Sequence, residues 1–131
     1  MNDRKRVTVG EVMRGDFIVM DGLMTVADAI VALRDQGAKE LIVDKRDDED
    51  EYGIVQLADI AKRVLAKDRA PERVNIYEIM TKPVVGVHPG MDVRYCSRLF
   101  LNFGIASVPV IDAGKVVGMV GYRELVLGGM I

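Results

Sequence analysis

The tripeptide Glu11-Val12-Met13 recurs as Glu78-Ile79-Met80, and this repetition decides how the rest of the chain is interpreted. Four more pairs keep the same spacing of 67 residues: Met24 with Met91, Val26 with Val93, Gly37 with Gly104, and Val43 with Val110. Gly53 then matches Gly118 at a spacing of 65, so the second copy is two residues shorter. The difference falls in a polar loop, where changes of length cost little. The ordered matches predict two tandem copies of one fold unit.

Both copies open with a pattern typical of a helix start. Thr8 precedes Glu11 by three residues, and Asn75 precedes Glu78 in the same way. This is the spacing of a capping box, in which the cap residue and the acid exchange hydrogen bonds. A short helix carrying the methionine of the repeated tripeptide is predicted after each cap.

A longer amphipathic helix is predicted in the middle of each copy. From Thr25 onward, apolar residues occur with the i, i+3, i+4, i+7 spacing of one helix face, and Gly37 ends the pattern. Its counterpart begins at Asp92 and ends at Gly104.

Strands and a closing helix complete each copy. The predicted strands are residues 17–20, 41–43 and 53–55 in the first copy and 84–87, 108–111 and 116–120 in the second. Asp112-Ala113-Gly114 predicts a tight hairpin turn. The closing helices are predicted at 57–66 and 122–127, and the polar segment 67–74 is predicted to link the copies.

The resulting unit is β-α-β-β-α, and two such units make a mixed α/β (α+β) fold. The predicted repeats are residues 8–66 and 75–131. A three-stranded sheet with two helices on one face leaves its other face open. Because a unit of about 60 residues buries little surface alone, we expect the two copies to pack sheet against sheet with pseudo-two-fold symmetry. That packing would create two clefts, where we expect the function.

Composition excludes several classes of protein. The 131 residues are 50% hydrophobic and 29% charged, which is typical of a globular domain. A net charge of −2 argues against nucleic acid as the main partner. No apolar run approaches the roughly 18 residues of a membrane span, so no membrane association is expected. One cysteine cannot form an internal disulfide, which favours the reducing cytoplasm.

The repeated motifs resemble a tandem pair of cystathionine-β-synthase-type (CBS) domains, also called a Bateman module, as found in small stand-alone CBS proteins. The resemblance covers about residues 8–127. The motifs that carry it are Glu78-Ile79-Met80-Thr81, Gly104-Ile105-Ala106-Ser107-Val108-Pro109-Val110-Ile111-Asp112, Gly53-Ile54-Val55-Gln56-Leu57-Ala58-Asp59-Ile60 and Gly118-Met119-Val120-Gly121-Tyr122-Arg123-Glu124-Leu125.

The resemblance implies an adenosine-containing ligand (AMP, ADP, ATP or S-adenosylmethionine) in the clefts between repeats, with no cofactor required. In the family pattern, a Thr or Ser precedes an Asp by three residues at the start of the last helix. The first copy keeps the acid as Asp59 but has Gln56 in place of Thr or Ser. The second copy has Gly121 and Glu124, with Arg123 beside the acid where a phosphate contact is implied. The carboxylates would accept hydrogen bonds from the ribose hydroxyls.

Strand residues would supply the slot for the adenine ring. The residues implied are Ile54, Ser107, Val108, Pro109 and Met119. Glu40 and Ser107 occupy matched positions, and a glutamate facing a phosphate would repel it, as would Asp92. The two clefts are therefore expected to differ.

Three other possible sites are rejected: a nucleophilic pair, a zinc site and a calcium-binding loop. Cys96 lies on an apolar helix face and His88 in a turn, so they are not expected to form a nucleophilic pair or a zinc site. The acidic run 47–51 lacks the spacing and central glycine of an EF-hand. It is interpreted as a solvated hairpin loop, in which disorder is one alternative.

The sequence thus predicts a non-catalytic regulatory module rather than an enzyme. A ligand-free dimerisation or scaffold module is the alternative. The apolar C-terminal stretch 125–131 predicts a homodimer interface, or an edge where the chain was cut from a longer protein.

Overall fold

The computed structural model of the chain describes residues 6–82 and 84–131, which form two compact units. The first-copy unit is Phe17–Val84. The second-copy unit is Val85–Ile131 together with the segment that ends at Asp16. Helices and strands occur in both units, as the predicted α/β class requires. Among the described residues, none of the helices has the length and apolar character needed to cross a membrane.

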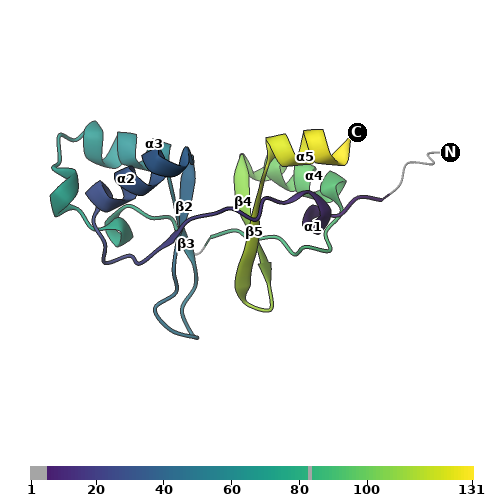
Figure 1. Cartoon of the computed structure of the whole chain (residues 1–131), viewed down its shortest axis with the longest axis horizontal. Coiled ribbons are helices and arrows are strands. Elements are labelled where there is room, and N and C mark those ends of the chain that lie inside the picture. Colours follow the sequence, from purple (N-terminus) through teal and green to yellow (C-terminus); the bar gives the residue numbers. More distant parts are fainter. Residues whose placement is uncertain (1–5, 83) are drawn as a thin grey trace. The chain divides into compact units, whose positions relative to one another are not determined.

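The first-copy unit is a three-stranded sheet with helices on one face. Strand β1 (Val19–Met20) pairs in parallel with β2 (Glu40–Val43), which pairs antiparallel with β3 (Gly53–Gln56). The crossover helix α2 (Val26–Gln36) and the closing helix α3 (Leu57–Ile60) cover the sheet (Figure 1). The core is formed by Val26, Ala29 and Leu33 of α2 with Leu41, Val43 and Val55 of the strands and Ile60 and Val64 beyond them. The predicted β-α-β-β-α order is confirmed in this copy.

The predicted helix starts and stops are confirmed at several positions. The backbone N–H of Thr8 donates to Glu11 Oε2 at 2.8 Å, and that of Asn75 donates to Glu78 Oε2 at 2.7 Å. Gly37 ends α2 with a φ of +61°, a conformation that glycine adopts without strain. Helix 57–66 is also present, although its last turn, Ala61–Leu65, is a π-helix.

The second-copy unit repeats this plan, except that its sheet has only two strands among the described residues. Helix α4 (Val93–Phe103), the antiparallel pair β4 (Ser107–Asp112) and β5 (Lys115–Gly121), and helix α5 (Tyr122–Gly129) follow in order. The predicted strand at 84–87 is wrong: in this segment only Val87 bridges Val110, in parallel. Gly86 stands where the first copy has Val19, and a glycine weakens a strand because it has no side chain to pack.

Each compact unit contains the opening segment of the other sequence copy. Helix α1 (Val9–Val12) belongs to the second-copy unit, where the Val9 N–H donates to the Met91 carbonyl at 2.8 Å. In the first-copy unit, the Ile76 N–H of the turn Ile76–Glu78 donates to the Met24 carbonyl, also at 2.8 Å. The compact units therefore differ from the sequence repeats 8–66 and 75–131, whose boundaries remain a prediction.

Two details of these segments correct the predicted elements. Both short helices end before the methionine of the repeated tripeptide, at Val12 and at Glu78. The predicted linker 67–74 contains a 3-10 turn, Pro71–Arg73, and its last residue, Val74, is buried in the first-copy core. Part of this segment is therefore structural rather than a free connection.

Candidate functional site

The first candidate site is the junction where β3 ends at Gln56 and α3 begins at Leu57. The Gln56 N–H donates to Asp59 Oδ2 at 2.8 Å. This bond holds the Asp59 carboxylate at the start of the helix, where the helix dipole favours a negative charge. We call this region, with Glu40 paired to Gln56 on the neighbouring strand, the first junction.

The second junction is the matched region of the other unit, where β5 ends at Gly121 and α5 begins at Tyr122. The Gly121 N–H donates to Glu124 Oε1 at 2.7 Å, so the longer glutamate makes the same capping bond as Asp59. Ser107 pairs with Gly121 across the β4–β5 ladder. The extra methylene therefore does not change the role of the acid within the fold.

Each junction also receives a residue of an opening segment. Arg14 N–H donates to the Met119 carbonyl at 2.8 Å, and Met119 N–H donates to the Arg14 carbonyl at 3.0 Å. Thr81 and Ile54 exchange the same two bonds at 2.9 and 3.0 Å in the first-copy unit. The Arg14 Nε lies 3.7 Å from Glu124 Oε1. Arg14 and Thr81 are thus part of the junctions.

Sequence reasoning missed Arg14 and Thr81. They are related by the 67-residue spacing and each follows the methionine of the repeated tripeptide, so the repeat alone pairs them. Their proximity to the junctions could not be read from it, because that depends on the exchange of opening segments.

The predicted adenine-slot residues fall on both faces of their strands, some in the core and some facing away from the helices. Val108 is 1% exposed and packs in the core of its unit with Cys96 and Phe100. Pro109 and Met119 face each other in the ladder and are not members of that core cluster. Because successive side chains point to opposite faces of a sheet, Pro109 and Met119 project away from the helices, and Ile54 does so in the first-copy unit.

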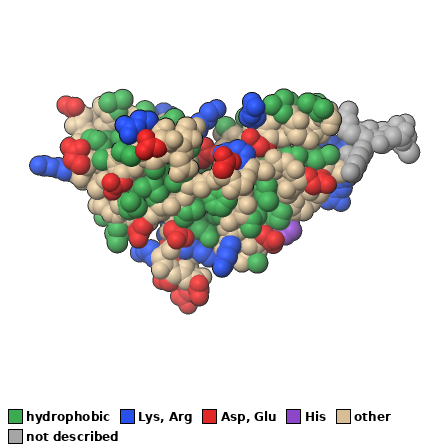
Figure 2. Space-filling model, viewed as in Figure 1, with side chains coloured by type: hydrophobic (Ala, Val, Ile, Leu, Met, Phe, Trp, Pro, Cys, Tyr) green, Lys and Arg blue, Asp and Glu red, His purple; other side chains and the backbone are tan. Residues whose placement is uncertain are grey.

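The acidic hairpin loop is held by hydrogen bonds at Asp50, while Asp47, Asp48 and Glu49 are exposed, as the predicted solvated loop requires. Asp50 Oδ2 accepts from the Arg46 N–H at 2.9 Å and from Arg46 Nε at 3.1 Å, and Asp50 Oδ1 pairs with Lys82 Nζ at 2.5 Å. The hydrogen bond from Lys82 and those from Arg46 hold the pKa of Asp50 well below its usual range. Figure 2 shows acidic side chains gathered at the tip of this hairpin, but Asp50 itself is only 8% exposed.

Replacing Asp50 with alanine is expected to release this loop. The Arg46 amide would lose its acceptor, so its hydrogen exchange should accelerate, whereas Asp48→Ala should leave exchange unchanged. The pKa of Asp50 is lowered on folding. The stabilisation of the loop by its carboxylate is therefore complete above the pKa of the unfolded chain, roughly 4. This stabilisation disappears as the pH falls toward the lower pKa of the folded protein. Amide exchange measured by NMR checks both points, and equal protection in the two variants would contradict the role given to Asp50.

A groove of about 590 Å³ lies beside this loop in the first-copy unit. It is lined by Asp21, Gly22, Leu23, Val43, Asp44, Lys45, Arg46, Tyr77, Met80 and Lys82. None of the ten ligand-binding residues predicted from sequence lines it. The groove is therefore distinct from both junctions.

The chemistry of Cys96 does not suit nucleophilic catalysis. Cys96 is fully buried, and burial raises the pKa of its thiol to about 11, so the thiol is protonated at neutral pH. His88 is exposed, accepting from the Gly90 N–H at 2.9 Å while its Nε2 lies 3.6 Å from Asp112 Oδ1. Over residues 6–82 and 84–131, no cluster of three or more His, Cys, Asp or Glu side chains could hold a metal ion.

Known proteins are similar to this chain in sequence and fold. The CBS domain family model matches residues 76–128. A hexameric CBS-CP12 protein from bloom-forming cyanobacteria is 33% identical, with a TM-score of 0.89 over 95% of this chain and 72% of that one. The CBS domain pair of protein MJ0100, solved with 5′-methylthioadenosine and S-adenosyl-L-methionine, is 25% identical, with a TM-score of 0.81 over 97% and 100% of the two chains.

Longer proteins also contain a similar segment. A homoserine O-acetyltransferase of Methanosalsum zhilinae is 32% identical over 91% of this chain and 23% of its own length. The chain spans between 23% and 62% of the curated relatives that it matches.

Proposed function

Because the chain belongs to the CBS domain family, we propose that it is a non-catalytic regulatory module that binds an adenosine-containing ligand of the AMP, ADP or ATP class. The ligand would use the two junctions, with Asp59 and Gln56 holding ribose in one and Glu124 and Arg123 holding ribose and phosphate in the other. No cofactor would be required. Occupancy would reach a regulated partner by favouring one of two states of the module, which requires a different ligand affinity in each state.

One observation carries this proposal: an acid is held at the same place in both junctions by its own helix start. The 2.8 Å bond to Asp59 and the 2.7 Å bond to Glu124 fix the carboxylates before any ligand arrives. A carboxylate oxygen has more than one lone pair, so the capping bond leaves capacity to accept from ribose. The related MJ0100 domain pair was solved with two adenosine-containing ligands, which supports the ligand class. The single, buried cysteine suits a cytoplasmic location.

Substituting Glu124 with alanine should lower the affinity for AMP about tenfold or more, since hydrogen bonds to a charged acceptor contribute roughly 1.5–3 kcal/mol each. The same change removes a helix cap, so a matched control is needed. Asp28→Ala removes the equivalent cap of α2, where Thr25 N–H donates to Asp28 Oδ2 at 3.2 Å, far along the chain from the junction.

Isothermal titration calorimetry on both variants gives the measurement. Weakened AMP binding in Glu124→Ala with unchanged binding in Asp28→Ala supports the assignment. Equal affinities in both would contradict it. If the unsubstituted protein shows no thermal shift with millimolar AMP, ADP, ATP or S-adenosylmethionine, where binding would raise stability by linkage, the ligand-free scaffold is the better account.

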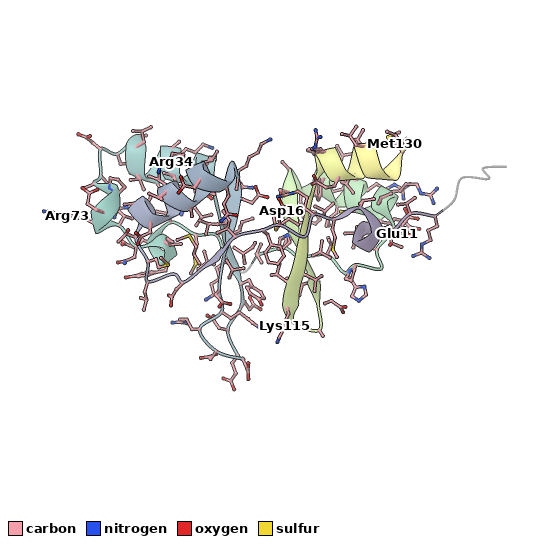
Figure 3. The ribbon with its side chains drawn as sticks, in the orientation of Figure 1. Glu11, Asp16, Arg34, Arg73, Lys115 and Met130 are labelled. Atoms are coloured by element: carbon pink, nitrogen blue, oxygen red, sulfur yellow. The ribbon has the colours of Figure 1, made fainter. Side chains whose placement is uncertain are left out.

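We also propose that the module forms a homodimer through α5 and the residues that follow it. Val126, Leu127 and Met130 are 47%, 50% and 68% exposed, and Figure 3 shows Met130 at the end of that helix. Exposed apolar side chains on one helix favour association, which is most often two-fold symmetric. The similar cyanobacterial protein is hexameric, which supports self-association in general.

Leu127→Glu is expected to convert the dimer into a monomer, because association would bury the new charge without a partner. Light scattering coupled to size-exclusion chromatography measures the mass. Leu23→Glu, at a position 74% exposed in the first-copy unit, should leave the dimer intact. A monomeric mass for the unsubstituted protein would rule out this interface.

A further inference from the structure

The two junctions carry different charges at matched positions. The first junction is made by Glu40, Gln56, Ala58, Asp59 and Thr81. The second is made by Ser107, Gly121, Arg123, Glu124 and Arg14. The formal charge of these five positions is therefore −2 in the first junction and +1 in the second.

The fold fixes the side chains responsible for this difference. Arg14 is held beside β5 by its two backbone bonds with Met119, and its Nε lies 3.7 Å from Glu124 Oε1. Five N–H donors allow one guanidinium to contact Glu124 and a phosphate oxygen together. In the first junction, the matched residue is the neutral Thr81, held in the same way by Ile54.

The acids of the first junction are also fixed. Glu40 is only 9% exposed and pairs with Gln56 in the β2–β3 ladder, while Asp59 is bonded to the Gln56 N–H. Two carboxylates on the same junction oppose the approach of a phosphate, and they do so more strongly where water is partly excluded. A ligand without phosphate, or one with a positive charge, avoids this repulsion.

We infer that the two junctions select adenosine ligands by the charge of the 5′ group. The second junction takes a phosphate-bearing nucleoside, with Arg14 and Arg123 as its phosphate contacts. The first junction takes an adenosine whose 5′ group is an uncharged thioether or a cationic sulfonium. This inference rests on the proposed function and assigns a different ligand to each site, so the module could report on two ligands at once.

Calorimetry with AMP and 5′-methylthioadenosine as probes tests the assignment. In the unsubstituted chain, AMP should bind at one site per chain, with an affinity that falls as NaCl is raised, and the thioether should bind with little dependence on salt. Arg14→Thr, which installs the residue of the first junction, should weaken AMP about tenfold and leave the thioether unchanged. Arg14→Lys, which keeps the charge, should restore part of the AMP affinity.

The reciprocal change tests the first junction. Glu40→Ser combined with Thr81→Arg gives it the residues of the second junction at these two positions and changes its formal charge from −2 to 0. The AMP stoichiometry should then rise from one to two per chain. Thermal unfolding without ligand establishes that each variant is folded. If Arg14→Thr does not fold, Arg123→Ala replaces it, because Arg123 is exposed and its loss should also weaken AMP alone.

Different results would contradict the proposed function and the charge selection between the junctions. The charge selection is wrong if AMP binds at two equal sites in the unsubstituted chain. It is also wrong if neither Arg14→Thr nor Arg123→Ala changes the AMP affinity. Either result leaves the proposed function standing. If neither probe binds the unsubstituted chain, both proposals fall.

Discussion

Replacing Phe100 with alanine is expected to lower the free energy of unfolding by about 3–5 kcal/mol, as is typical when a large buried aromatic side chain is removed. Phe100 is fully buried in α4 and packs in the second-copy core. Its ring meets that of Tyr122 edge to face, with centroids 5.2 Å apart and an interplanar angle of 82°. The substitution removes both the buried apolar area and this aromatic pair, and it leaves a cavity in the core.

Urea unfolding followed by circular dichroism measures this change. Phe103 offers a matched control on the same helix, because it is 68% exposed. Phe103→Ala should change stability by no more than about 0.5 kcal/mol. A loss of less than 1 kcal/mol in Phe100→Ala would mean that this core is more loosely packed than its burial indicates.

Local signals in the sequence were sufficient for most of the secondary structure. At Thr8 and Asn75 the acid three residues later accepts from the backbone N–H of the cap residue, and this bond needs no distant partner. Gly37 and Gly104 end their helices with positive φ, a conformation that glycine adopts with little cost. Such features depend on neighbours in the chain, so composition and spacing predict them.

Features that depend on distant segments were not predictable. The repeat pairs Arg14 with Thr81, but only the tertiary structure shows that Arg14 lies beside Met119 and Glu124. The ion pair of Asp50 in the acidic loop depends in the same way on Lys82, about 30 residues further along the chain. Without Lys82 in place, a run of five acids is expected to repel itself and remain disordered.

The matched glycines Gly53 and Gly118 show why both copies keep a residue without a side chain at one position, and their substitution is the second large effect. A methyl group at Gly118 would lie 2.6 Å from Sδ of Met13 and 2.7 Å from the backbone oxygen of Arg14. At Gly53 it would lie 2.8 Å from Sδ of Met80, with the nearest backbone oxygen at 3.3 Å. The methionine after each short helix thus packs directly on the glycine of a strand.

Gly118→Ala is expected to lower the free energy of unfolding by about 2–3 kcal/mol, within the usual range for overpacking. Gly53→Ala should cost less, because a flexible methionine can move while the Arg14 backbone, bonded to Met119, cannot move freely. The control is Gly15→Ala, where a methyl group would meet nothing within 4 Å.

Replacing each methionine with alanine separates the clash with the methionine side chain from the clash with the backbone oxygen. Met80→Ala should rescue Gly53→Ala almost fully, whereas Met13→Ala should rescue Gly118→Ala only in part, because the contact with the Arg14 oxygen remains. Each effect is measured against its single variants in a double-mutant cycle. Equal rescue in the two copies would mean that the backbone near Arg14 yields as readily as a side chain, and the opening segment would then be too mobile to fix Arg14 at the second junction.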